Sequence, residues 1–379
     1  MEARSLAEAL KLIMKGRGWS QLRLARELGV SQVWVSQVSR EQRDTGIMKA
    51  SRLLARVGWE LCITPIGEEE DPVKRRSFIA AAASVTFMPS AKVGPYQDPQ
   101  YLRALATQLR TTRYEIGGVP LAATALRHLG KIGQSINASD PDLQVASAGL
   151  ARAASVVLYD ARMFEKSESA GNLALVLAKR ADHLEDTAHA FELLSQVSSY
   201  RGDYRRAAMY AQRGLGLPAL TDECKARLSV RLGVSLAKTK VGGTERRSRT
   251  LLDVAHGYDG SSSGTTAMIL GSSGIVLSSL GHHEEGERYL DEAVHRFQGI
   301  PLLHGLWLGE SAHAAIRAAD PNRAAHHMQI VARLAPLITS SRFDQKVDEI
   351  LAVSARWASV PEMRDAREQL RTIQSSTKA

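Results

Sequence analysis

Near the start of the chain, apolar residues recur at the spacing of a short helix. Ser20 is placed to cap the start of this helix, and Gly29 can adopt the left-handed conformation that ends one. The positions three and four apart share one face, which makes that face apolar. Its apolar positions are Leu22, Leu24, Ala25 and Leu28.

A second helix is predicted directly after the first. Ser31 can cap its start, and Val35 and Val38 lie on one face. The pair is too short to hold a core of its own, so the flanking segments must supply one. Apolar residues at helical spacing in those segments are Leu6, Ala9, Leu10, Ile13, Met48, Leu53, Leu54 and Val57.

The stretch WSQLRLARELGVSQVWVSQVSR resembles the helix-turn-helix of the lambda-repressor/Cro type, also called the XRE type. The resemblance covers about residues 4–62 and implies that the second helix of the motif enters the DNA major groove. Glutamine can pair with adenine there, and valine can contact a thymine methyl group. The resemblance assigns base contacts to Gln32, Val33, Ser36 and Gln37. It assigns a phosphate contact to Gln21, and Arg17, Arg23, Arg40 and Arg43 are further candidates for phosphate contacts.

One residue of this stretch departs from the family pattern. Trp34 stands where small or polar residues are usual. Its side chain either packs on the DNA sugar and backbone or supports the helix from inside, and the sequence leaves both open.

The charge is unevenly distributed. The net charge is +9, and residues 1–56 hold eleven Lys and Arg against five Asp and Glu. A compact basic segment is typical of a protein that binds the phosphate backbone, although a solvated basic surface has the same composition.

The composition changes from residue 64. Pro65, Gly67, four consecutive acidic residues and Pro72 indicate a linker. The segment RRSF, followed by IAAAASVTFM, resembles a twin-arginine export signal, but such signals stand at the N-terminus. The apolar run is also too short to span a bilayer. We expect an internal helix around Phe78 that packs on the next domain or on a second subunit.

The remainder of the chain repeats. Consecutive turns lie 40, 41, 38 and 38 residues apart, and each is followed by a helical pattern. The turns begin at Arg162, Gly202, Gly243, Gly281 and Ala319. A small residue follows each turn by five positions, where two helices of a hairpin would touch: Ser167, Ala207, Ser248, Gly286 and Ala324. Weaker units begin near Gly117 and Pro361.

These units resemble degenerate tetratricopeptide repeats with helices longer than the 34-residue standard. Each unit cannot bury its apolar face alone, so neighbouring units must stack into a solenoid. The first helix of each hairpin would line a concave surface, where polar residues either hold a ligand or serve as solvated faces and contacts between repeats. The candidates are Glu192, Gln196, Ser199, Arg227, Arg231, Lys238 and Glu310. Asp259–Thr266 reads as a flexible loop.

The sequence therefore predicts an all-α protein, since alanine and leucine supply most apolar residues and aromatic residues only 5%. Residues 1–63 are expected to form the helix-turn-helix domain and 64–98 a linker with an apolar helix. Residues 99–373 are expected to form a tetratricopeptide-like repeat domain for sensing and dimerisation, and 374–379 a frayed tail.

This architecture resembles the RRNPP family of bacterial quorum-sensing regulators. The resemblance implies a homodimer on a palindromic DNA operator, and a solenoid that binds a signalling peptide and thereby changes DNA affinity. Whether the signal is a peptide or a small molecule stays open. In the alternative, the repeats are a scaffold that docks a partner protein without a small signal.

Several function classes lack their motifs. There is no GxxxxGK[ST], GxSxG or HExxH motif, so we expect neither enzymatic activity nor a cofactor. The histidine pairs at 282–283 and 326–327 have no cysteine or carboxylate at ligand spacing, so no metal is expected. Cys62 and Cys224 are far apart and are expected to be reduced, buried thiols. With no membrane segment expected, the sequence favours a cytoplasmic protein.

Overall fold

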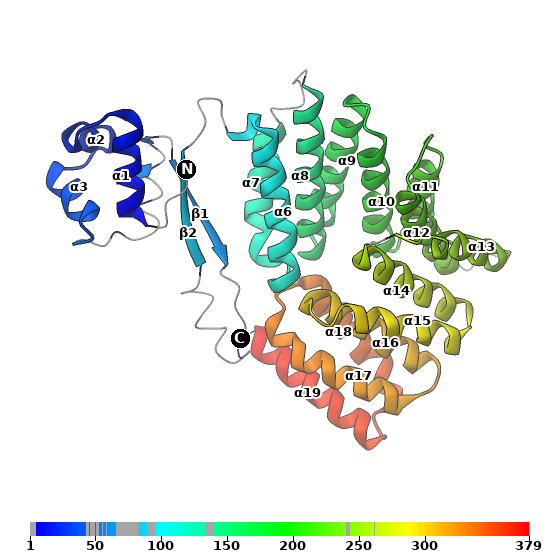
Figure 1. The fold of residues 1–379 in the computed structure, drawn as a ribbon. Coiled ribbons are helices and arrows are strands. Elements are labelled where there is room, and N and C mark those ends of the chain that lie inside the picture. The colour runs from blue at the N-terminus through cyan, green and yellow to red at the C-terminus, as the bar shows by residue number, and fades with distance from the viewer. Residues whose placement is uncertain are drawn as a thin grey trace. The chain divides into compact units, whose positions relative to one another are not determined.

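The structure is a computed structural model that describes residues 5–42, 45, 50, 53–54, 56–57, 59–65, 83–89, 95–133, 140–239, 243–260 and 262–378. The chain divides into two compact units, Met1–Gln97 and Asp98–Ala379. Each unit is described by itself (Figure 1).

The first unit contains the predicted pair of helices and a third before it: α1 (Leu6–Arg17), α2 (Gln21–Leu28) and α3 (Gln32–Ser39). The side chains of Ser20 and Ser31 accept hydrogen bonds from backbone N–H groups in the first turns of α2 and α3. Gly29 ends α2 in the left-handed conformation, with φ of 68°. The predicted caps are therefore confirmed.

One core holds these helices together. Most of the flanking residues predicted to supply it are buried in it, but Leu22 is 47% exposed and so does not belong to the apolar face of α2. Met48 lies outside the described residues. The buried core consists of Ala9, Leu10, Ile13, Leu24, Ala25, Leu28, Trp34, Val35, Val38, Leu53, Leu54, Val57 and Trp59.

Two strands follow, and the second lies where part of an apolar helix was predicted. β1 (Trp59–Pro65) pairs antiparallel with β2 (Ala83–Pro89), with Cys62 opposite Thr86. The prediction of a helix is wrong for 83–89, because Val85, Thr86 and Phe87 favour an extended chain. The rest of that predicted helix, including Phe78, lies outside the described residues.

The second unit is a stack of helical hairpins, which confirms the predicted solenoid. Each hairpin packs on the next through both of its helices (Figure 1). The first helices are α6 (Pro99–Ile116), α8 (Pro141–Asp160), α10 (Leu184–Tyr200), α12 (Asp222–Thr239), α14 (Ser263–Leu280), α16 (Pro301–Arg317) and α18 (Ser341–Val353). Their partners are α7 (Ala122–Ile132), α9 (Phe164–Arg180), α11 (Tyr204–Leu215), α13 (Thr244–His256), α15 (His283–Arg296), α17 (Pro321–Leu334) and α19 (Pro361–Lys378).

The turns inside five hairpins lie where the sequence places them. All five predicted turn residues have a positive φ, which reverses the chain between two helices. Three are glycines, which adopt this conformation at little cost, whereas Arg162 and Ala319 adopt it despite their side chains. The values of φ are 58° at Arg162, 80° at Gly202, 79° at Gly243, 92° at Gly281 and 61° at Ala319.

The small residue after each turn is buried at the contact between the two helices. In the hairpin of α8 and α9, two serines exchange hydrogen bonds. The hydroxyl of Ser167 donates to the carbonyl of Ser155 at 2.8 Å, and the hydroxyl of Ser155 donates to the carbonyl of Ser167 at 2.7 Å. In the hairpin of α14 and α15, a side chain on Gly274 would meet the backbone of Gly286 within 2.7 Å. The predicted role of these positions is confirmed.

The stack closes on itself, because α16 and Thr339 meet α6, and α18 meets α8. The backbone N–H of Thr339 donates to the carbonyl of Ile116 at 2.8 Å, and the N–H of Val119 donates to the carbonyl of Thr339 at 3.3 Å. Gly117 permits this approach, since a Cβ there would lie 2.3 Å from the carbonyl oxygen of Thr339. The repeat unit therefore forms a closed ring of hairpins rather than an open stack.

Two smaller expectations are corrected. Residues 263–266 belong to the first turn of α14 rather than to a loop, because Ser262 caps that helix. Residues 374–378 continue α19 instead of forming a frayed tail. By length and composition, α14 is the one described helix apolar enough to cross a membrane, and 56% of it is buried inside the repeat unit.

Candidate functional site

The first turn of α3 presents the residues predicted to read DNA bases. Gln32 and Val33 are exposed, Val33 to 64%, although valine is usually buried. Ser36 and Gln37 are half-buried one turn later. Trp34 is only 4% exposed and lies in the core. Its side chain therefore supports the helix from inside, which was one of the two alternatives that the sequence left open.

The basic residues predicted to contact phosphates differ in how freely their side chains can move. A guanidinium nitrogen of Arg17 donates to the carbonyl of Val57 at 2.6 Å, and the group stacks 4.8 Å from the ring of Trp19. Arg23 lies over the same ring at 5.3 Å. Arg17 is therefore exposed but anchored by these two contacts.

The remaining predicted phosphate contacts have different surroundings. Arg40 is exposed at the end of α3, and Gln21 is half-buried at the start of α2. Arg43 lies outside the described residues.

The repeat unit carries a second group of predicted residues on its first helices. Glu192 on α10 is 5% exposed and binds two arginines of α12. Its carboxylate accepts from Arg227 at 2.8 and 3.2 Å and from Arg231 at 3.4 Å. Arg227 also donates to the hydroxyl of Thr265 on α14 at 3.2 Å. Charged side chains therefore join three consecutive first helices.

The same pattern continues on both sides of this group. Arg152 of α8 lies 2.5 Å from the carboxylate of Asp186 on α10. Lys346 of α18 donates to Glu310 of α16 at 2.8 Å. Lys238 lines the same small cavity as Glu310. We call these charged side chains of the first helices the inner face: Arg152, Asp186, Glu192, Arg227, Arg231, Lys238, Glu310 and Lys346.

These pairs shift the pKa values of the buried carboxyl groups. Burial alone would raise the pKa of Glu310, but the charges of Lys346 and Lys238 outweigh it and lower that pKa from 4.5 to about 2. The pKa of Glu192 is lowered in the same way: Arg227 and Arg231 hold it well below 4.5, although burial alone would raise it. Burial lowers the pKa of Lys238. Both carboxylates therefore stay charged at neutral pH.

A further cluster lies where the ring closes, and we call it the closing cluster. The carboxylate of Asp160 accepts from the N–H of Gly118 at 2.7 Å and lies 3.1 Å from a guanidinium nitrogen of Arg342 and 3.9 Å from one of Arg113. Arg342 also donates to the hydroxyl of Tyr159 at 3.0 Å and stacks on that ring. Asp160 is fully buried, and Arg113 and Arg342 nearly so. Its members are Arg113, Tyr159, Asp160 and Arg342.

Four of the seven predicted ligand residues are thus ion-paired, and Lys238 lines the cavity beside Glu310. Gln196 and Ser199 lie half-buried further along α10. The sequence analysis missed Arg152, Asp186, Lys346 and the closing cluster. Arg152 had a detectable signal, because it stands in the middle of an otherwise apolar stretch of α8. The closing cluster had none, since its partners are far apart in sequence.

The space beside the inner face is small. The cavity lined by Lys238, Glu310 and His313 has a volume of about 10 Å³, which suffices for one water molecule. Burial lowers the pKa of His313 from 6.5 to about 4, so its ring is neutral there. The charges around Glu192 are less enclosed, since the side chains of Arg152 and Arg227 are 26% and 25% exposed.

Comparisons with known proteins give limited information. No known family and no curated protein matches the sequence. Among solved structures, the chain is similar to the apo form of RapI, with a TM-score of 0.37 and 10% identity over 94% of this chain and 98% of that one. A likeness this weak carries no argument, so the repeat architecture rests on the helices themselves.

Proposed function

We propose that the chain is a sequence-specific DNA-binding regulator of transcription. Its repeat unit binds a signalling ligand, a peptide in our proposal, and mediates dimerisation in the cytoplasm. The observation that carries the proposal is the first turn of α3, where Gln32 and the 64%-exposed Val33 stand on a helix whose other side is buried. Exposed residues of this kind can read bases in a major groove.

The inner face supports a ligand with negative charge. Its cations are held by carboxylates of the inner face and by two neighbouring ones, Glu223 beside Arg227 and Glu349 beside Lys346. A carboxylate of a ligand can replace Glu192 or Glu310 as partner of these cations. At Glu310 such an exchange requires the surrounding helices to separate, because the cavity there holds only one water molecule.

This requirement suggests a two-state mechanism. The described structure is the closed state, held by the inner face and the closing cluster. A ligand that binds an open state better shifts the population toward it, by no more than its difference in affinity for the two states. In a dimer, the shift changes the distance between two α3 helices, which must lie one DNA turn apart on a palindromic operator.

The DNA part is tested with full-length protein and genomic fragments selected for binding. Once a site is identified, Gln32→Ala should lose about 1–3 kcal/mol of affinity for it, with no change on random DNA. Gln100→Ala, equally exposed on α6, serves as the control and should bind as the unaltered protein does. Equal losses on both DNAs would contradict base reading by Gln32.

The ligand part is tested on the same site, with and without an extract of the producing culture. We expect the extract to change site occupancy. Arg231→Gln should abolish this response while DNA binding persists, since Arg227 still pairs Glu192. Arg205→Gln, exposed on α11, should leave the response intact. A response that survives in Arg231→Gln would move the ligand site away from the inner face.

The small cavity favours a second candidate function, in which the repeats dock a partner protein on their outer surface. A depression of about 250 Å³ lies there between α12 and α13, lined in part by Lys225, Val254 and Tyr258. A DNA site that is insensitive to every extract fraction, together with a protein retained by the full-length chain, would favour this scaffold.

A further inference from the structure

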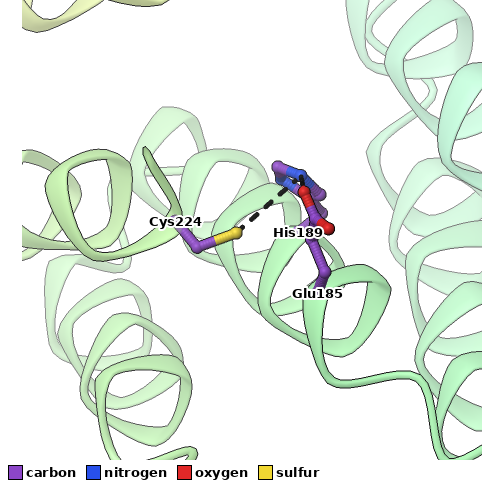
Figure 2. Close-up of side chains that lie close together, drawn as sticks. All are labelled: Glu185, His189 and Cys224. Carbon is purple, nitrogen blue, oxygen red and sulfur yellow. Dashed lines mark hydrogen bonds and ion pairs between the residues drawn. The ribbon is translucent and has the colours of Figure 1, made fainter. Parts of the chain in front are cut away.

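Three side chains of the types that bind transition metals meet between two repeats. Glu185 and His189 lie one turn apart on α10, and Cys224 faces them from the first turn of α12 (Figure 2). Nε2 of His189 is 3.9 Å from the sulfur of Cys224 and 3.8 Å from a carboxylate oxygen of Glu185. The three ligand atoms all lie within 4.8 Å of one another.

The other ring nitrogen of His189 faces a carboxylate. Its Nδ1 lies 3.8 Å from Glu192, which Arg227 and Arg231 hold in place. Histidines that bind metals usually have such a partner, which orients the ring and directs the free nitrogen to the ion.

From this arrangement we infer that Glu185, His189 and Cys224 bind Zn²⁺ as three protein ligands. Thiolate, imidazole and carboxylate are the ligands zinc takes, whereas magnesium and calcium prefer oxygen atoms alone. Binding releases the thiol proton of Cys224 and the proton on Nε2 of His189 to solvent, and both atoms then donate a lone pair to the ion. A fourth position stays open to water.

The distances need only a small adjustment. Zinc bonds of about 2.0–2.3 Å at tetrahedral angles place ligand atoms roughly 3.3–3.6 Å apart, a few tenths of an ångström less than the two distances to His189. Glu185 supplies most of the movement, since its side chain is 52% exposed and free to rotate. Cys224 is 2% exposed, so an ion enters from the side of Glu185.

The site would clamp two neighbouring repeats. Glu185 and His189 belong to one first helix and Cys224 to the next, so a bound ion links α10 to α12 at one end of the inner face. Glu192 connects the two, because it contacts both His189 and the arginines of α12. Zinc would therefore stabilise the closed state, and this holds whether or not the chain binds DNA.

The test is a metal titration of the reduced full-length protein, with Zn²⁺ in competition with a chromogenic chelator and with Co²⁺ as a spectroscopic probe. We expect one ion per chain and a thiolate-to-cobalt charge-transfer band. Cys224→Ser should remove the band and weaken zinc at least about tenfold. Glu185→Gln should also weaken zinc, and it cannot disturb folding because the side chain is at the surface.

Cys62→Ser is the matched control, since Cys62 is the other thiol of the chain. It should leave the band, the stoichiometry and the affinity unchanged. Thermal unfolding should shift upward with Zn²⁺ in the control but not in Cys224→Ser. The inference is overturned if zinc binds equally well to Cys224→Ser and the unaltered chain, or if the band disappears with Cys62 instead.

Discussion

At the scale of single residues, burial separates neighbours that the sequence leaves together. Val33 and Trp34 are both large and apolar, yet one is 64% exposed and the other 4%. Helical spacing predicts Val35 and Val38 as buried, but Trp34 lies at the edge of that face, where spacing alone does not decide. Its burial depends on α1 and on Leu53, Leu54, Val57 and Trp59, whose positions a local pattern does not contain.

Glu310 makes a prediction about pH. Its folded pKa of about 2 lies below the ordinary 4.5, so its ion pair with Lys346 contributes stability above pH 4.5. This contribution decreases as the pH falls from 4.5 to 2, because the carboxylate takes up a proton. Glu310→Gln lacks it at every pH. The difference in unfolding free energy between the two proteins should therefore be largest near neutral pH and shrink toward pH 2.

Denaturant titrations of both proteins at several pH values measure this difference. Glu292→Gln, which alters an exposed pair with Arg296 on α15, is the control and should change stability by less than about 1 kcal/mol at any pH. A difference for Glu310→Gln that does not depend on pH would show that the pair does not lower the pKa of Glu310.

At the scale of elements, the sequence predicts the positions of the helical hairpins well, but it predicts poorly the segments that connect them. The five turns and their small residues were predictable because a chain reversal between packed helices needs a positive φ and a close contact at a fixed offset. The β-hairpin was not, since alanines before Val85 favour a helix while pairing with β1 decides the structure. Likewise, the glycine and serines of 262–266 suggest a loop, although Ser262 begins a helix.

The contact between α14 and α15 gives the second prediction. A methyl group on Gly274 would lie 2.7 Å from the carbonyl oxygen of Gly286, a backbone atom that cannot move aside. Gly274→Ala should therefore destabilise the repeat unit by about 1–3 kcal/mol, as overpacking does. Gly149→Ala in α8 is the matched control, with no atom within 4 Å of the added methyl.

Alanine at position 149 should instead stabilise by about 0.5–1 kcal/mol, because glycine inside a helix is the less favourable residue. Thermal unfolding distinguishes the two effects, because the midpoint temperature should fall for Gly274→Ala and rise for Gly149→Ala. A gain in stability for Gly274→Ala would mean that the two helices pack farther apart than described.

At the scale of the whole repeat unit, closure is the feature that sequence analysis could not supply. Repeat spacing predicts an open stack in which each hairpin contacts its neighbours only. The closing cluster instead joins Asp160 and Arg342, and Thr339 pairs with the backbone at residues 116 and 119. These contacts depend on the curvature accumulated over all intervening hairpins, which no single unit encodes.

Asp160 therefore makes the third prediction. Asp160→Asn removes the charge that two buried arginines face, and this should cost about 3–5 kcal/mol. The ring should also open, which would increase the radius of gyration in small-angle X-ray scattering. Asp142→Asn makes the same substitution in the same helix at an exposed pair with Arg103, and should cost less than about 1 kcal/mol. Equal effects of the two would argue against closure by this cluster.

Closure also sets the order in which the protein can mature on the ribosome. Tyr159 and Arg342 are 183 positions apart, so at about 5–20 residues per second they emerge roughly 10–40 s apart. During that interval α6 and α8 fold with their closing ends in water, and Asp160 keeps its hydration shell. Arg342 of a second nascent chain can then reach the ends of α6 and α8 in the first chain as readily as the first chain's own Arg342 can. Crowding of polysomes should therefore favour dimers that exchange α18 and α19, an outcome that dilution of the translating chains should suppress.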